Sequence, residues 1–131
     1  MNINQIQPPD LYKSPAFSQA IEVAAPSKML FIGGQNAIDK HGNLVGPNDF
    51  AAQAKQALLN IKTILDHAGY SIHNVVDLTI FYTNGNNGRL GYQAFLDIFG
   101  MPDVPPTVSA IQVENMGIPE RLVEIKAIAV K

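Results

Sequence analysis

Residues 104–131 read VPPTVSAIQVENMGIPERLVEIKAIAVK. The end of this stretch combines charged and apolar residues in one predicted strand, and the arrangement of the fold must account for both. The segment predicts two strands, Thr107–Val113 and Arg121–Val130, joined by a turn. The second strand carries Glu124 and Lys126 inside a run of Ile, Val, Ala and Leu. An exposed face, a sheet edge or a functional site would each explain a carboxylate and an amine at these positions.

The longest periodic segment lies before this stretch, at residues 50–69, and predicts an amphipathic helix. Asn48 or Asp49 can cap its first turn, and Gly69 ends it because glycine tolerates a positive φ. The expected apolar stripe is Ala54, Leu58, Ile61, Leu65 and Ala68, while Gln53, Lys55, Gln56, Lys62 and Asp66 are expected to lie away from it.

The remaining elements complete an α+β pattern. Strands are predicted at residues 16–24, 29–38 and 75–83, and a shorter helix at residues 89–100. Residues 6–15, which contain three prolines, predict an extended lead-in segment that is not helical. The order β-β-α-β-α-β-β predicts an α+β sandwich with two helices on one face of a mixed sheet.

Both faces of the last strand are apolar, although two helices can cover only one of them. We therefore expect the other face to be buried by a second copy of the chain, with Glu124 and Lys126 at or near a subunit interface. One face carries Val123, Ile125, Ala127 and Ala129, and the other carries Leu122, Ile128 and Val130 beside the polar pair.

Length and composition exclude several classes of protein. A chain of 131 residues with 47% hydrophobic residues suits one globular domain, residues 1–131. Without cysteine it has no disulfide or thiolate nucleophile, and its three histidines lack metal-ligand spacing. A net charge of −2 without a basic stripe gives no expectation of nucleic-acid binding. No segment predicts a signal peptide or a membrane span, so we expect a soluble cytoplasmic protein.

Five residues are candidates for a functional site, each with a structural alternative. Glu124 can hold a water as a general base, or can form an ion pair with a neighbouring amine. Gly33 and Gly34 can expose N–H groups to a ligand, or can form a bulge in their strand. Ser109 can donate a hydrogen bond to a ligand or to the local backbone. Arg89 begins a helix, where the dipole disfavours a cation, so it either has an anionic partner or is a surface residue.

The chain resembles the RidA/YjgF family of reactive-intermediate deaminases, also labelled L-PSP endoribonucleases. The similar segments run in order from about Phe17 to Val130: FSQAI, FIGGQNAIDKHGNLVG, DFAAQAKQALLNIKTILDHAGYSIHNVVDLTIFYTN, YQAF and LVEIKAIAV. The resemblance implies a chorismate-mutase-like fold and a homotrimer with ligand clefts between subunits. It also implies hydrolysis of 2-imino and enamine acids to 2-keto acids and ammonia, without a metal or cofactor.

Two substrate-binding side chains of the deaminases are replaced here. The family's P-x-R-S/T motif matches PTVS, so Val108 stands where the resemblance places the arginine that grips the substrate carboxylate. Phe17 stands where it places a tyrosine, so a hydroxyl is absent as well. Valine can neither donate a hydrogen bond nor carry a charge. The chain therefore resembles a subgroup of the family that lacks this arginine.

Other positions of the family motifs are partly kept. The water-holding glutamate of VEIE is present as Glu124, and its second glutamate is Lys126. Gly34 is kept, whereas Gly33 replaces a serine and Arg89 replaces an asparagine. We hypothesise that Arg89, with Lys126 as a second candidate, reaches the cleft and partly replaces the missing arginine.

Three functions remain open from the sequence. The first is an enzyme that hydrolyses a C=N or C–N bond of a small imine or enamine. The second is a trimer that binds a small molecule in a regulatory role without turnover, which the valine at position 108 favours. The third, a ribonuclease or chaperone-like role, is disfavoured by the acidic pI of about 5.8.

Overall fold

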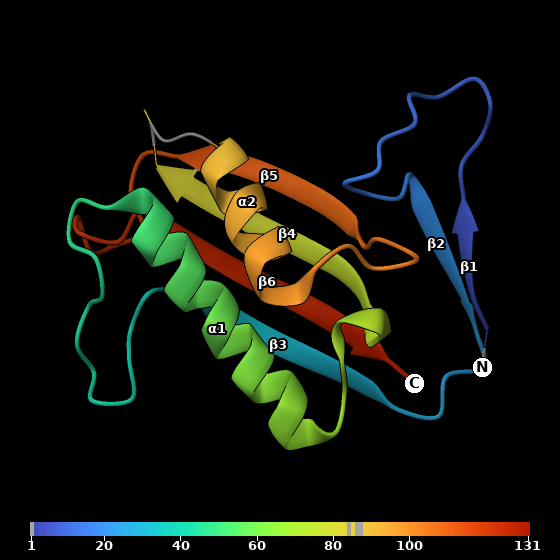
Figure 1. Cartoon of the computed structure of the whole chain (residues 1–131), viewed down its shortest axis with the longest axis horizontal. Helices are drawn as coiled ribbons and strands as arrows, with labels where there is room; N and C mark the ends of the chain where they lie inside the picture. Colours follow the sequence, from blue (N-terminus) through green and yellow to red (C-terminus); the bar gives the residue numbers. More distant parts are fainter. Residues whose placement is uncertain (1, 84, 86–87) are drawn as a thin grey trace.

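Strand β6 (Val123–Val130) lies inside a four-stranded mixed sheet and connects its two halves. A computed structural model describes residues 2–83, 85 and 88–131 (Figure 1). The sheet order is β3-β6-β4-β5; β6 runs antiparallel to both neighbours, and β4 and β5 are parallel. The other strands of the sheet are β3 (Met29–Gln35), β4 (Val75–Thr83) and β5 (Thr107–Val113).

Helices α1 (Phe50–Ala68) and α2 (Gly88–Phe99) lie on the same face of this sheet, as predicted (Figure 1). A short 3₁₀-helix, Ile72–Asn74, leads from α1 into β4. The expected strands at residues 75–83 and 107–113 match the observed bounds, and the last strand begins two residues later than expected. The α+β class with helices on one face is therefore confirmed.

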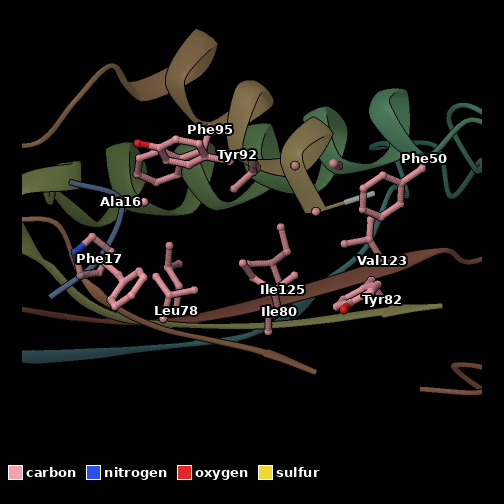
Figure 2. Close-up of a pocket in the computed structure, with 17 residues that line it drawn as sticks. Ala16, Phe17, Phe50, Leu78, Ile80, Tyr82, Tyr92, Phe95, Val123 and Ile125 are labelled. Carbon is pink, nitrogen blue, oxygen red and sulfur yellow. The ribbon is translucent and has the colours of Figure 1, made fainter. Parts of the chain in front are cut away.

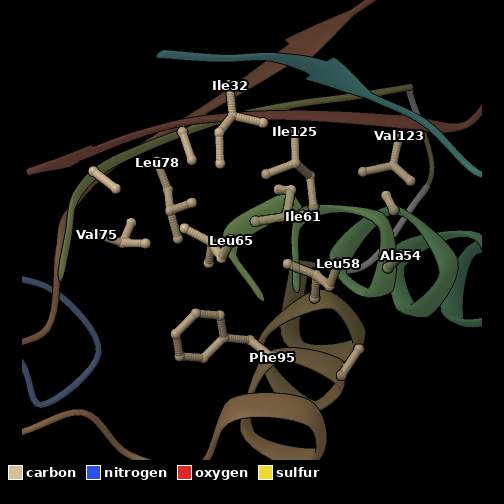
Figure 3. Packing of buried hydrophobic residues seen from close by; sticks show 14 of the residues in the cluster. Ile32, Ala54, Leu58, Ile61, Leu65, Val75, Leu78, Phe95, Val123 and Ile125 are labelled. Atoms are coloured by element: carbon tan, nitrogen blue, oxygen red, sulfur yellow. The ribbon is translucent and has the colours of Figure 1, made fainter. Parts of the chain in front are cut away.

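The alternation predicted for β6 is confirmed by its burial. Val123, Ile125, Ala127 and Ala129 are buried against the helices, and Lys126 on the other face is exposed. Figure 3 shows Ile32, Leu78, Val123 and Ile125 of the sheet facing Leu58, Ile61 and Leu65 of α1, with Phe95 of α2 beside them.

Both ends of α1 follow the predicted capping. Asp49 is the N-cap, and its side chain accepts a hydrogen bond from the Ala52 N–H at 3.0 Å. Gly69 adopts the left-handed conformation, with φ of 75°, and ends the helix.

The strand at the N-terminus was not predicted. Residues 2–6 form a strand, β1 (Asn2–Ile6), which pairs antiparallel with β2 (Ala20–Ala24), whereas the sequence predicted no strand before residue 16. The segment NINQI is short and half polar, so its strand pattern is weak until β2 supplies a partner. The hairpin forms its own two-stranded sheet beside the start of β5 (Figure 1).

The expected exposure of Gln53 was also wrong, because its side chain is fully buried. Its amide nitrogen donates to the carbonyls of Gly46 (3.1 Å) and Glu120 (2.9 Å), and its amide oxygen accepts from the Leu122 N–H (2.9 Å). A single side chain of α1 thus satisfies backbone groups in two loops, one before α1 and one before β6. The spacing of apolar residues along α1 does not show that a polar side chain is needed at this position to bond backbone groups in distant loops.

No described helix is both long enough and apolar enough to cross a membrane.

Replacing Gln53 with alanine should lower the free energy of unfolding by about 2–4 kcal/mol, because it removes three partly buried hydrogen bonds from a fully buried side chain to the backbone. Chemical denaturation of the purified protein measures the change. Gln56→Ala is the matched control: within the described part of the chain, the half-buried side-chain amide of Gln56 donates to Asn60 alone, so we expect a loss below about 1 kcal/mol. Equal losses in the two variants would contradict the role given to Gln53.

Candidate functional site

The carboxylate of Glu124 lies directly over the backbone of Gly34. A Cβ atom built on Gly34 would come within 2.6 Å of the Glu124 Cδ and Oε2 atoms, so only glycine leaves room for this side chain. The pairing of β3 with β6 shifts register between Ile32 and Gln35, which fits the bulge predicted at the paired glycines. Gly33 is exposed, and a Cβ there would meet no atom within 4 Å.

Asn36 joins this group, although the sequence did not single it out. Its side-chain amide lies 3.5 Å from the Glu124 Oε1 atom, at the limit of a hydrogen bond. The Asn36 carbonyl accepts from the side chain of Asn60 on α1 at 3.1 Å, which fixes the backbone after β3. The polar residue directly after GGQ was the available signal. We call Gly34, Asn36 and Glu124 the carboxylate site.

Glu124 is half-buried and faces away from the helices, since its neighbours Val123 and Ile125 are buried on the helix side. Lys126 lies on the same face and is exposed. In the described part of the chain the two side chains form no ion pair with each other. The carboxylate is therefore available to a water or a ligand.

A second candidate site is an apolar pocket between α2 and the sheet, with a volume of about 240 Å³. Figure 2 shows Tyr92 and Phe95 of α2 above Leu78 and Ile80 of β4, with Phe17 near one end and Phe50 near the other. The lining residues are Ala16, Phe17, Phe50, Ala54, Leu58, Leu78, Ile80, Tyr82, Gly88, Gly91, Tyr92, Phe95, Pro106, Val108, Ala110, Val123 and Ile125.

Phe17 reaches the pocket because the segment before β2 is anchored to the start of β5. The Ser18 N–H donates to the Pro106 carbonyl at 3.0 Å, and the buried Ser18 hydroxyl donates to the Pro105 carbonyl. Gln5 of β1 donates in turn to the Ser18 oxygen at 2.9 Å. These bonds hold Phe17 in the same pocket as Val108. The family resemblance places a tyrosine at position 17 and an arginine at position 108.

The structure therefore separates the predicted site residues into two groups. Phe17 and Val108 meet in the pocket, whereas Glu124 and Gly34 meet on the opposite face of the sheet. Ser109 is exposed and lies on the open face, because Val108 and Ala110 on either side of it line the pocket. A single chain does not bring the two groups together.

Arg89 does not line the pocket, although its neighbours Gly88 and Gly91 on α2 do. Its side chain is exposed in the single chain. The hypothesis that Arg89 reaches a cleft between subunits stays a prediction.

The described ionisable groups outside these two sites include no cluster that could bind a metal and one carboxylate, Asp39, that stabilises a turn. Among residues 2–83, 85 and 88–131, no three His, Cys, Asp or Glu side chains gather in a way that could hold a metal ion. A hydrogen bond from the Asn43 N–H lowers the pKa of Asp39 in the tight turn at residues 39–43. This carboxylate stabilises the turn.

A family model described as Endoribonuclease L-PSP matches residues 10–131. The chain belongs to the RidA/YjgF family. A RutC family protein of Pyrococcus horikoshii is 34% identical over 88% of this chain and 86% of the relative. A protein of Mus musculus named 2-iminobutanoate/2-iminopropanoate deaminase is 32% identical over 91% of this chain and 87% of its own length.

Solved structures of RidA/YjgF proteins confirm the chorismate-mutase-like fold expected from the resemblance. The crystal structure of the Rid family protein YyfB from Yersinia pestis matches with a TM-score of 0.87, at 34% identity and over the full length of both chains. That of the YjgF gene product of E. coli matches with a TM-score of 0.69, at 28% identity, over 88% of this chain and 87% of the other.

Gly34→Ala should displace the Glu124 side chain with little loss of stability, because the clashing atoms belong to the flexible end of that side chain. We expect a clear change in the ¹³C chemical shift of the Glu124 carboxyl carbon and a change in unfolding free energy of about 1 kcal/mol or less. Gly33→Ala is the control, since its Cβ would meet nothing. An unchanged Glu124 resonance in Gly34→Ala would contradict the packing described for the carboxylate site.

Proposed function

We propose that this RidA/YjgF protein is a hydrolase that acts on the C=N bond of a small imine, or on an enamine after its conversion to the imine. The observation that carries the proposal is the Glu124 carboxylate, half-buried over Gly34 and free of an ion pair with Lys126 in the described chain. The mouse relative named as an imino-acid deaminase supports the reaction class.

The chemistry needs one residue that moves a proton. Glu124 accepts a proton from a bound water while the water oxygen bonds to the imine carbon. The carboxyl returns this proton to the nitrogen, which gives the carbinolamine R₂C(OH)–NH₂. Glu124 then takes the hydroxyl proton and passes it to the nitrogen, so the C–N bond breaks and ammonia leaves as the carbonyl forms. The sum is R₂C=NH + H₂O → R₂C=O + NH₃, and no electron acceptor is consumed.

The complete site in this proposal forms between subunits of a homotrimer. One chain places its carboxylate site and its apolar pocket on opposite faces of the sheet, so one subunit would supply Glu124 and a neighbour would supply the pocket. The open face also exposes Met29 (53%), Phe31 (70%) and Ile111 (43%), which supports burial by another copy. A cytoplasmic location is part of the same proposal.

A small-molecule-binding trimer without turnover is the second candidate. The pocket favours it, because Val108 and Phe17 leave no cation or hydroxyl at the positions that the resemblance gives to substrate binding. Arg89 or Lys126 of an adjoining subunit would have to supply the missing charge for a 2-imino acid. A ribonuclease or chaperone-like role ranks last, given the acidic pI of about 5.8.

Glu124→Gln should lower the rate of imine hydrolysis by about 10²–10⁴-fold, because the amide cannot accept the proton of the attacking water. Two substrates are followed: 2-iminobutanoate, generated in situ by a dehydratase, and the imine of acetophenone, which has no carboxylate. Glu114→Gln is the control, since Glu114 is exposed in the loop after β5. Light scattering should report a trimer for all three proteins.

The proposal fails if the wild-type trimer accelerates the loss of neither imine. Ligand-induced thermal stabilisation without product would then favour the binding trimer. Arg89→Ala separates two forms of the enzyme: a rate on 2-iminobutanoate that falls in this variant means that Arg89 grips the carboxylate, and an unchanged rate means that it does not.

A further inference from the structure

The apolar pocket offers no partner for a charged substrate. Of the described residues that line it, none has a charged side chain, and the polar side-chain atoms are the hydroxyls of Tyr82 and Tyr92. The Tyr92 hydroxyl lies 3.9 Å from the Met101 sulfur. An ionised carboxylate that entered this pocket would lose its hydration without gaining a charge partner, which is strongly unfavourable.

The pocket is large enough for a ring or a branched hydrocarbon group. Its volume of about 240 Å³ exceeds that of a cavity of roughly 150 Å³ that accommodates benzene. Five aromatic side chains line it, and aromatic walls favour a planar ring through edge-to-face and offset contacts. These side chains are Phe17, Phe50, Tyr82, Tyr92 and Phe95.

Helix α2 keeps part of this space open with glycine. Gly91 lines the pocket, and a Cβ built on it would meet only the Phe50 ring edge, at 4.0 Å. A longer side chain at this position would occupy the pocket without a backbone clash. Substitution of Gly91 by a larger apolar residue therefore reduces the volume of the pocket without changing its charge.

We infer, on the basis of the proposed function, that the substrate is an imine or enamine whose bound group is an uncharged aromatic or branched hydrocarbon. Val108 determines this specificity, with Phe17 beside it, because an arginine at position 108 would put a cation into the same space. The standard 2-imino acids, which carry their carboxylate on the reacting carbon, are poor substrates of such a site.

Two ketones test this inference by binding alone, since they are the products of imine hydrolysis. Acetophenone and phenylglyoxylate share a phenyl ring and a ketone. Acetophenone carries a methyl group on the ketone carbon, whereas phenylglyoxylate carries a carboxylate there. Calorimetric titration should show acetophenone bound to the wild-type protein and phenylglyoxylate bound at least about tenfold more weakly. Val108→Arg should reverse this order, and His67→Arg, which adds the same charge at an exposed position on α1, should leave it unchanged.

Gly91→Leu provides a second variant that does not alter charge. It should weaken acetophenone binding at least about tenfold while the circular dichroism spectrum is retained. If Val108→Arg fails to fold, the wild-type preference and Gly91→Leu still decide. The inference is overturned if phenylglyoxylate binds the wild-type protein as tightly as acetophenone, if acetophenone does not bind, or if Gly91→Leu leaves its affinity unchanged.

Failure of this inference can be told apart from failure of the proposed function. The ketone titrations measure binding to the pocket without turnover, whereas the imine assay measures hydrolysis, and Glu114→Gln should leave both unchanged because Glu114 is exposed in the loop after β5. If the binding pattern holds and no imine is hydrolysed, the enzyme proposal fails and the specificity of the pocket stands. If 2-iminobutanoate is hydrolysed and phenylglyoxylate is the tighter ligand, the enzyme proposal stands and the inference fails.

Discussion

The two-residue repeat of strand β6 is the constraint on which the rest of this structure depends. Because successive side chains point to opposite faces, Val123 and Ile125 must pack under the helices if Glu124 is to face the open side. Strand β5, which lies on the far side of β4, obeys the same rule, with Val108 in the pocket and Ser109 on the open face. Shifting either strand by one residue would exchange core and site, so stability and site geometry are fixed together.

That constraint also explains why the candidate site is incomplete in one chain. The sheet itself separates the Glu124 carboxylate from the pocket, and no rotamer of Glu124 can cross a layer of hydrogen-bonded strands. A reaction that uses both must therefore take them from different subunits. The exposed Phe31 and Ile111 on the open face point to the same requirement, since such side chains are stabilised by burial.

Local sequence patterns predicted most helices and strands correctly, whereas contacts between residues far apart in the sequence were not predicted. The bounds of β4 and β5, the Asp49 cap and the Gly69 stop follow from periodicity and capping chemistry within a few neighbouring residues. Strand β1 was missed because its stability comes from pairing with β2, and the pocket was missed because residues from six segments enclose it. Gln53 was misplaced because its partners lie in distant loops.

The nature of the pocket argues for an altered ligand more than for a decayed site. An arginine lost by drift from a carboxylate-binding pocket would leave its polar partners behind, buried and without hydrogen bonds, at a cost in stability. Here Val108 lies with Phe17, and the hydroxyl that the resemblance places at position 17 is absent as well. Aliphatic and aromatic side chains surround both positions, so the replacements agree with each other. Meanwhile Gly34 still leaves room for the Glu124 carboxylate, which any side chain at position 34 would displace, so the other half of the site is kept.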